Sequence, residues 1–240
     1  MEINTSFQKL QAELGVLISS MSAGERLLSE PKLAKQLGVS RATLREAMRT
    51  FETQGLIRRR QGSGTFVVGQ APVLESGLEV VESIETMARR MGMVVTVRDL
   101  VVEAILASKK DAQKLGVPLD TPLTRVSRVM CTANRSAAFL VDTLPSDFLA
   151  VDKFPEKFTG SVLDFLMGLG IVPSVARIAV NASSAPSFVA KALEIQRGDV
   201  LLRLSSQLYL DSEQVIDYSL GYFLPGYFHF HVLGRVGSAR

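Results

Sequence analysis

The chain has 240 residues, of which 47% are hydrophobic, and this length and content predict two domains, each with its own core. The formal net charge of +3 is unevenly distributed, because residues 1–70 hold 10 Lys and Arg against 6 Asp and Glu, whereas the remainder holds 17 against 18. The single cysteine excludes an internal disulfide framework, and the chain shows neither a signal-peptide pattern nor a run of about 18 apolar residues, so we expect a cytoplasmic protein without a membrane segment.

The first forty residues show the pattern of two helices. Apolar residues at helical spacing predict an amphipathic helix over 6–20. Ser29 stands two residues before Pro31, which is typical of a helix start. This second helix is short and should end at Gly38.

A third helix and a hairpin follow. Ser40 is placed to cap this helix, which should end at Gly55. Two short strands are then expected over 56–60 and 65–68, joined by a glycine-containing loop. Residues 1–70 are therefore predicted to form one domain in the order helix, helix, turn, helix, hairpin.

The chain changes character beyond residue 70. Residues 71–91 are predicted to be a linker followed by a connecting helix over 77–91, and residues 92–240 a second domain. The expected strands of that domain are 94–106, 121–131, 137–144, 174–184, 199–210 and 214–223, with short helices near 109–115, 161–168 and 186–194. This pattern predicts an α+β fold with an antiparallel sheet.

Three arginines of the third predicted helix indicate DNA binding. Arg41, Arg45 and Arg49 recur every four residues, so their guanidinium groups share one face of the helix. An α-helix fits the major groove, where arginine can bond guanine O6 and N7, and Arg41 near the N-terminus is the expected base reader. The alternative is a solvated face in which the arginines pair with Glu46 and Glu52.

Residues around this helix extend the predicted contact. Ser40 and the helix N-terminus are placed to meet phosphate. Arg58, Arg59 and Arg60 run into the hairpin, where exposed members can neutralise backbone phosphates. Gly62 at the hairpin tip allows the backbone to approach a groove closely.

Residues 27–68 resemble the winged helix-turn-helix of the GntR family of bacterial regulators over almost their whole length. The shared motifs include Gly38-Val39-Ser40-Arg41, Leu44-Arg45-Glu46-Ala47 and Gln61-Gly62-x-Gly64-Thr65-Phe66-Val67. The resemblance implies recognition-helix contacts from Arg41, Thr43 and Arg45 and a minor-groove contact from Gly62, whereas Pro31 replaces a frequent basic or polar contact. The candidate DNA-binding residues are Ser29, Glu30, Ser40, Arg41, Thr43, Arg45, Arg49, Arg60 and Gly62.

The remainder of the chain, from about residue 74, resembles the UTRA effector domain of the HutC subfamily, whose fold is similar to chorismate lyase. The resemblance rests on segments such as RVSRVM, DTLP and GSVLDFLMGLG. It implies a domain that binds a small-molecule effector and dimerises.

Arg128 is the main candidate for contact with that effector. Strand alternation places Arg128 and Asp142 each on an apolar strand face. They either form a structural ion pair across neighbouring strands, or Arg128 meets an anionic ligand. The resemblance favours the ligand, because sugar-phosphate-binding relatives use an Arg-x-Arg pair on this strand. Met130 replaces the second arginine here, so a smaller or more apolar anion is expected.

Three further residues complete the predicted effector site. The resemblance implies ligand contacts from Ser161 and Asp217, although Ser161 is also a good helix cap and Asp217 could face solvent. Tyr222 is a candidate as well, with sheet core or dimer interface as the alternative. His229 and His231 would point to one side of a strand, but no cysteine or acidic partner lies near them in sequence, so we expect no metal site.

Together the two modules predict a homodimeric transcription regulator, a repressor by family habit. It should bind an inverted repeat of double-stranded operator DNA with an affinity controlled by a small anionic effector. The alternative is a lyase-like enzyme fused to a DNA-binding module, because fold alone does not fix function. No nucleophile with a partner base is recognisable, so we expect neither catalytic residues nor a cofactor.

Overall fold

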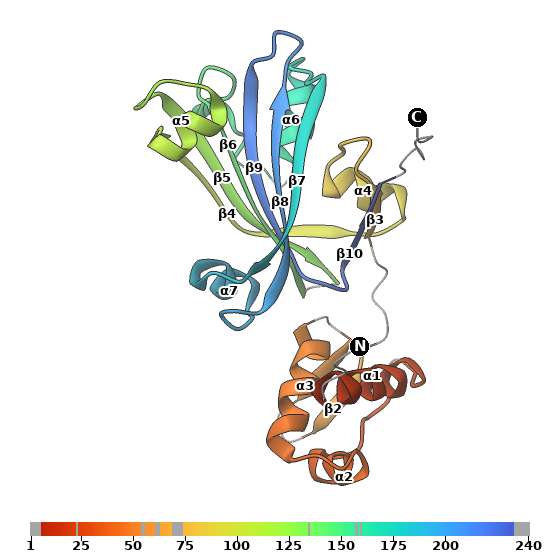
Figure 1. Cartoon of the computed structure of the whole chain (residues 1–240). Helices are drawn as coiled ribbons and strands as arrows, with labels where there is room; N and C mark the ends of the chain where they lie inside the picture. The colour runs from red at the N-terminus through yellow and green to blue at the C-terminus, as the bar shows by residue number, and fades with distance from the viewer. Residues whose placement is uncertain are drawn as a thin grey trace, which may run out of the picture. The chain divides into compact units, whose positions relative to one another are not determined.

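The computed structural model describes residues 6–22, 24–53, 56–60, 63–68, 74–133, 135–156, 158 and 160–232. The chain divides into two compact units, Met1–Val73 with Pro225–Tyr227, and Leu74–Leu224 with Phe228–Arg240 (Figure 1). The first is mainly helical and the second contains a large antiparallel sheet, as the predicted α+β fold class requires.

The first unit has three helices and a two-stranded wing. Its elements are α1 (Ser6–Ser19), α2 (Glu30–Gln36), α3 (Arg41–Thr53), β1 (Ile57–Arg60) and β2 (Gly64–Val67). The two strands pair antiparallel, and an isolated bridge between Arg26 and Phe66 extends the wing. This order is the winged helix-turn-helix that the sequence predicted.

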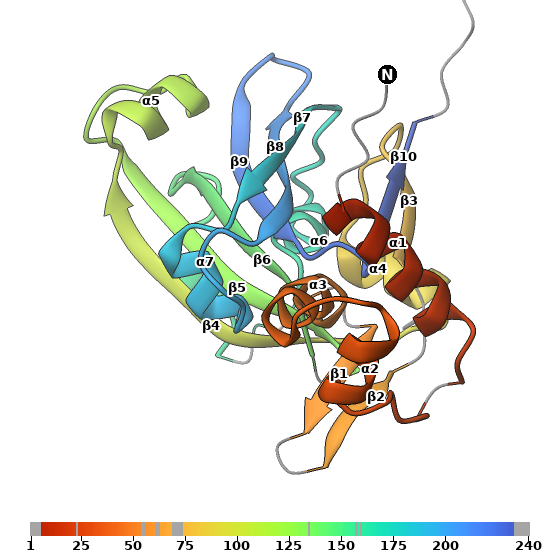
Figure 2. The same cartoon turned by 60° about the horizontal axis from the view of Figure 1, so that its bottom comes forward.

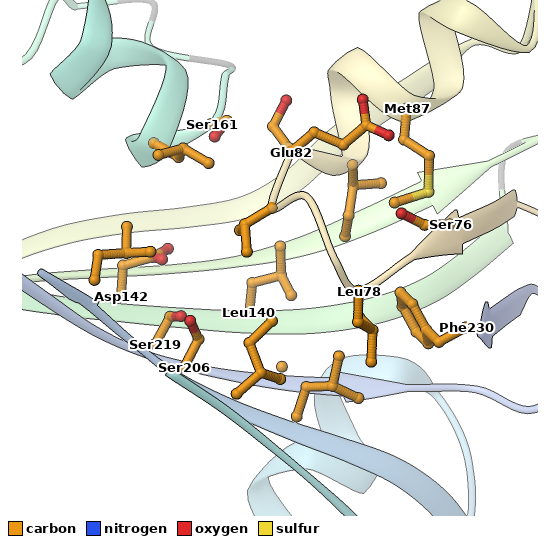
Figure 3. A pocket seen from close by; sticks show the side chains of 18 of the residues that line it. Ser76, Leu78, Glu82, Met87, Leu140, Asp142, Ser161, Ser206, Ser219 and Phe230 are labelled. Carbon is orange, nitrogen blue, oxygen red and sulfur yellow. The ribbon is translucent and has the colours of Figure 1, made fainter. Parts of the chain in front are cut away.

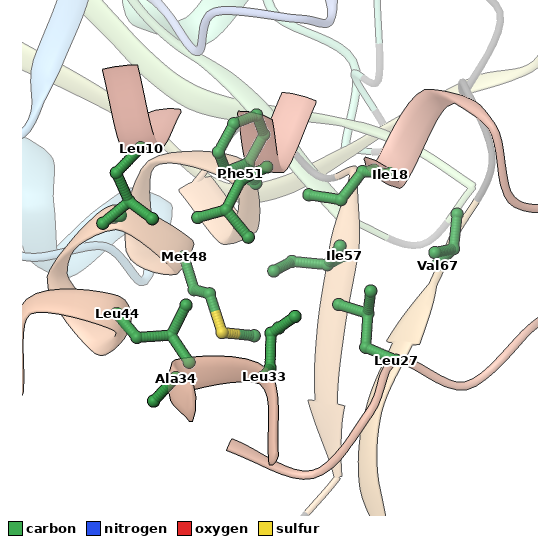
Figure 4. Packing of buried hydrophobic residues seen from close by; sticks show 12 residues of the cluster. Leu10, Ile18, Leu27, Leu33, Ala34, Leu44, Met48, Phe51, Ile57 and Val67 are labelled. Carbon is green, nitrogen blue, oxygen red and sulfur yellow. The ribbon is translucent and has the colours of Figure 1, made fainter. Parts of the chain in front are cut away.

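Each of these elements contributes apolar side chains to a single core. Leu10 of α1, Leu33 of α2, Met48 of α3 and Ile57 of β1 are all buried there (Figure 4). Burying a side chain of this size contributes about 1.5–3 kcal/mol, so the core holds the recognition helix against the wing. The turn before α3 passes through Gly38, whose φ of 65° suits glycine.

The second unit is built on a six-stranded antiparallel sheet with the strand order β4-β5-β6-β9-β8-β7 (Figure 2). These strands are β4 (Val95–Leu106), β5 (Pro122–Thr132), β6 (Arg135–Pro145), β7 (Val175–Ser184), β8 (Val200–Tyr209) and β9 (Val215–Phe223). Each lies within about two residues of its predicted range. The alternation of side chains along neighbouring strands gives the sheet two distinct faces.

Short helices cover both faces of the sheet. They are α4 (Ile84–Arg90), α5 (Lys109–Leu115), the 3-10 helix η1 (Val151–Lys153), α6 (Val162–Gly168) and α7 (Ser187–Leu193). On one face, Leu115 of α5 packs near Tyr218 and Phe188 of α7 packs against Tyr222. On the other, Leu166 of α6 joins the cluster around Val126. No helix in the described part of the chain is long and apolar enough to cross a membrane.

The predicted connecting helix over 77–91 is wrong in its first half. Residues Leu74–Gly77 form a strand, β3, that pairs in parallel with β10 (Phe228–His231), and the helix begins only at Ile84, where Ser83 Oγ accepts the N–H of Thr86. The partner strand lies at the other end of the sequence, so the local pattern could not reveal it. The segment thus belongs to the second unit rather than to a linker, and residues 69–73 lie outside the described residues.

Candidate functional site

Helix α3 carries the predicted arginine face. Ser40 Oγ accepts the N–H of Thr43 at 3.0 Å, which caps the helix at its predicted start. Arg41 is exposed and forms no ion pair in the described part of the chain. Leu44 and Met48 are buried on the opposite side. The N-terminal end of α3 therefore presents a free guanidinium, as base reading in the major groove requires.

Glu30 binds two of the candidate arginines, an arrangement that the sequence analysis missed. Arg45 Nε donates to Glu30 Oε2 at 2.6 Å, and one terminal nitrogen of Arg59 lies 3.2 Å from Oε1. The expected partner Glu46 makes only a 3.7 Å contact with Arg49. Exposed ion pairs contribute about 0–1 kcal/mol, so Arg45, whose side chain is 55% exposed, stays available to DNA. Glu30 is thus placed to orient these two arginines, and its own contact with DNA stays a prediction.

The structure describes two of the remaining DNA-binding candidates, Ser29 and Arg60. Ser29 occupies the N-cap position of α2, yet its side chain makes no capping hydrogen bond and is exposed. Arg60 is exposed on the wing, with its guanidinium carbon 5.1 Å from the centre of the Phe66 ring. Gly62 lies outside the described residues.

Arg26 adds a cation to the wing that the sequence analysis did not propose. A Cβ atom at Gly64 would lie 2.6 Å from Arg26 Nε, and Gly64 has a φ of 113°. Only glycine fits this position without strain, so the side chain of Arg26 can pass close to the wing backbone at Gly64. No sequence pattern indicated that Arg26 lies on the wing, because the bridge between Arg26 and Phe66 is a tertiary contact.

The second unit contains an open cavity on the face of the sheet that bears α4 and α6. One wall is the segment from Ser76 to Met87, and the floor is formed by the central strands (Figure 3). Polar side chains, among them Asp142, Ser206 and Ser219, gather at one end, and Leu78, Met87 and Phe230 line the other. The cavity therefore has a polar end and an apolar end.

An ion pair between Arg128 and Asp142 lies at the polar end. Val126 stands opposite Asp142 and Leu140 opposite Arg128, so both charged side chains project from the same face of the sheet. The Arg128 side chain is only 4% exposed. Burial lowers the pKa of Arg128, but nearby carboxylates, Asp142 foremost, more than offset this effect, so the guanidinium remains charged.

Two other carboxyl groups, those of Asp217 and Glu85, interact with this ion pair. For both, the positive charge of Arg128 offsets the effect of burial only in part. Burial raises the pKa of Asp217 well above its usual range, and Asp142 raises it further, against the opposing effects of Arg128 and the Thr143 backbone. Burial likewise raises the pKa of Glu85, with Arg128 opposing the shift. Four buried polar atoms here make no hydrogen bond to any described protein group: Glu85 Oε1, Arg128 Nε, Ser206 Oγ and Asp217 Oδ1. Such atoms are costly unless a bound molecule satisfies them.

Comparisons with known proteins assign the chain to a family. Residues 8–67 match the family model described as bacterial regulatory proteins, gntR family, and residues 90–229 match the UTRA domain model. The chain belongs to the gntR family and carries a UTRA domain. The winged unit and the cavity therefore lie in the two regions that define such regulators.

Individual relatives agree with this assignment. The HTH-type transcriptional repressor NagR of Bacillus subtilis is 27% identical over 194 residues, which cover 80% of this chain and 79% of the relative. The uncharacterized HTH-type transcriptional regulator YurK of the same organism is 28% identical over 197 residues, or 81% and 80%. PhnF from Mycobacterium smegmatis shares the fold, with a TM-score of 0.65, 20% identity and coverage of 95% of this chain and 100% of that one. NagR and YurK are named as regulators, so the lyase-like alternative is not favoured.

The UTRA domain brings three of the four predicted effector residues to one cavity. Arg128, Ser161 and Asp217 all line it. Ser161 also caps α6, because its Oγ accepts the N–H of Asp164 at 3.2 Å, so the helix-cap interpretation is confirmed and the ligand contact stays a prediction. Asp217 is 2% exposed, which excludes the solvent-facing alternative. The alternative of an ion pair for Arg128 is realised, although its Nε still has no partner.

The prediction that Tyr222 belongs to the effector site is corrected by the structure, because Tyr222 does not line the cavity. It stands on the opposite face of the UTRA sheet, where its ring lies 6.3 Å from that of Phe188 at 89°. The neighbouring Gly221 faces the cavity instead. The sheet-core alternative therefore describes Tyr222. Strand alternation was the available signal, because Asp217 and Tyr222 are five residues apart on one strand and so point to opposite faces.

Several cavity residues were not foreseen. Glu85 was hidden in the predicted connecting helix, and Ser206 and Ser219 stand opposite each other on β8 and β9. Small polar residues on otherwise apolar strands were the available signal for the two serines. His229 and His231 join no group of three or more potential metal ligands within the described ranges.

Replacing Asp217 with asparagine should stabilise the UTRA domain at neutral pH. A carboxyl whose folded pKa is raised favours folding most when protonated, and this contribution is lost as the pH rises from the unfolded pKa of about 4 towards the folded value. Asparagine is neutral at every pH, so the gain in melting temperature should be absent near pH 4 and grow towards pH 8. Asp152→Asn, at an exposed site, is the control. A lower melting temperature for Asp217→Asn at pH 8 would contradict this account.

Proposed function

We propose that the protein is a homodimeric repressor that binds an inverted-repeat operator and releases it when a small molecule occupies the cavity. In this proposal residues 1–70 read DNA, and the UTRA domain, which begins at β3, dimerises and senses the effector. The protein would act in the cytoplasm, where its DNA is.

One observation carries the regulatory part of the proposal. The cavity wall from Ser76 to Met87 directly follows, in the chain, the residues that leave the winged unit. A ligand that contacts this wall touches a segment that continues along the chain from the DNA-binding unit. Movement of the wall can therefore change the orientation of that unit. Such a ligand can shift the population between two orientations if it binds one of them better.

The expected anionic charge of the effector is not part of this proposal. That prediction depended on an Arg128 available to an anion, whereas Arg128 is paired with Asp142.

Selection of bound sequences from a random DNA pool by the full chain tests the DNA-binding part. We expect enrichment of an inverted repeat whose half-sites lie one helical turn, about 10 base pairs, or a multiple of it apart. Sedimentation of the full chain should give a dimer, since a two-fold operator mirrors a two-fold protein. Enrichment of a single half-site by a monomer would refute the dimeric part, and no enrichment at all would refute sequence-specific binding.

A further inference from the structure

Acidic side chains outnumber basic ones among the described residues that line the effector cavity. Its walls carry four carboxyl side chains, Glu82, Glu85, Asp142 and Asp217, and a single guanidinium, that of Arg128. An anionic ligand would need cations that are free to meet it. Among the described lining residues the cation is Arg128, and it is paired with Asp142.

Ion pairs account for only two of these carboxylates. Glu82 lies 2.6 Å from a terminal nitrogen of Arg90, and Asp142 is bound by Arg128. Glu85 and Asp217 form no ion pair within the described residues, and each keeps one buried oxygen without a hydrogen bond. The polar end of the cavity therefore holds carboxyl oxygens that no described residue meets with a hydrogen bond or a cation.

The opposite end is mainly apolar, and Ser76 is a polar side chain that also lies there (Figure 3). Leu78, Met87 and Phe230 lie together there, away from Asp142 (Figure 3). A ligand that fills both ends must carry a hydrocarbon or aromatic part as well as a polar one. A highly hydroxylated or phosphorylated molecule would leave this apolar wall without a matching partner.

We propose that the effector is a small amphipathic amine, whose ammonium group meets the carboxyl groups of Asp217 and Glu85 and whose apolar part packs against Leu78, Met87 and Phe230. This inference builds on the proposed function and names the ligand class for it. An ammonium donates hydrogen bonds and neutralises charge together, which is what the two unpaired carboxyls lack.

The electrostatics of the cavity residues agree with an amine. Burial raises the pKa of both Asp217 and Glu85, so the protein alone holds their ionised forms poorly. The groups that act on them are Arg128, Asp142 and, for Glu85, Asp164. A phosphate or carboxylate would add a further negative charge beside these acids, at a cost that Arg128 alone cannot offset.

Three probes of matched shape test the ligand class with the full chain: 2-phenylethylamine, 2-phenylethanol and 3-phenylpropionate. Hexylamine, hexanol and hexanoate form a second, non-aromatic set. Calorimetric titration at pH 7.5 should give, within at least one set, an amine Kd at least tenfold below that of the alcohol and no measurable binding of the acid. Failure of both amines to bind, or tighter binding of an acid than of its matched amine, overturns the proposal.

Two substitutions that remove the acidic groups test where the ammonium group of the ligand binds. Asp217→Asn and Glu85→Gln should each weaken amine binding at least tenfold and weaken binding of the matched alcohol by a much smaller factor, because a neutral hydroxyl carries no charge for the carboxyl to meet. Asp152→Asn, an exposed acid of the same unit, should change neither value. Equal loss of amine and alcohol binding, or unchanged amine binding in both variants, counts against the proposed contact.

Operator binding separates this inference from the proposed function. If the amine binds the cavity but operator affinity stays constant, the ligand class stands and the regulatory function fails. If a sugar phosphate or carboxylate releases the operator and the amines do not, the regulatory function stands and the amine proposal fails.

Discussion

Replacing Arg41 with alanine should weaken binding of the selected operator by about 1–3 kcal/mol and relax the base preference at one position of each half-site. Arg41 is exposed at the first residue of α3, and no described residue pairs with it, so its bidentate donor fork is free for a guanine. The loss should fall mainly on the specific complex, because a missing base contact leaves phosphate contacts intact.

Measurement of Kd for the operator and for random DNA, each at several salt concentrations, checks this expectation. Arg58→Ala is the matched comparison: Arg58 is exposed on the wing strand, so its loss should weaken all sequences alike and reduce the salt slope by about 1. Arg197→Ala, at an exposed site in the UTRA domain, should have no effect. If Arg41→Ala lowers affinity for all sequences equally, Arg41 contacts phosphate rather than a base.

Replacing Arg128 with methionine should lower the free energy of unfolding of the UTRA domain by about 3–5 kcal/mol, the usual cost of leaving one partner of a buried ion pair alone. Asp142 would lose its only described cation, and Glu85 and Asp217 would lose the positive charge that opposes their burial. No other described residue that lines the cavity is cationic, and the nearby Arg90 is paired with Glu82.

Urea unfolding followed by tyrosine fluorescence measures this change, because the chain has no tryptophan and Tyr209, Tyr218 and Tyr222 lie on β8 and β9. Arg125→Met, on the same strand, is the matched control. Arg125 is 31% exposed and lies 3.2 Å from Asp111, so its loss should cost about 1 kcal/mol or less.

A double variant separates the ion pair from simple packing. Arg128→Met combined with Asp142→Leu should recover much of the lost stability, since an apolar pair of similar volume can replace a buried ion pair. An Arg128→Met variant as stable as Arg125→Met would show that the pair contributes little.

The sequence by itself determined the features that depend on neighbouring residues. The face shared by Arg41, Arg45 and Arg49 follows from helix periodicity, and the caps at Ser40 and Ser161 follow from residue type and position, so all were predictable. Strand alternation likewise placed Arg128 and Asp142 on apolar faces before any pairing was known.

Only the tertiary structure decided which side chains meet. The contact of Glu30 with both Arg45 and Arg59, the pairing of β3 with β10, and the convergence of Glu85 and Asp217 on one cavity join residues far apart in sequence. The tertiary structure also decided which face of β9 borders the cavity, so that Gly221 faces it and Tyr222 faces away. Local propensities carry no information about register, because it is set by packing and hydrogen bonding across the whole sheet.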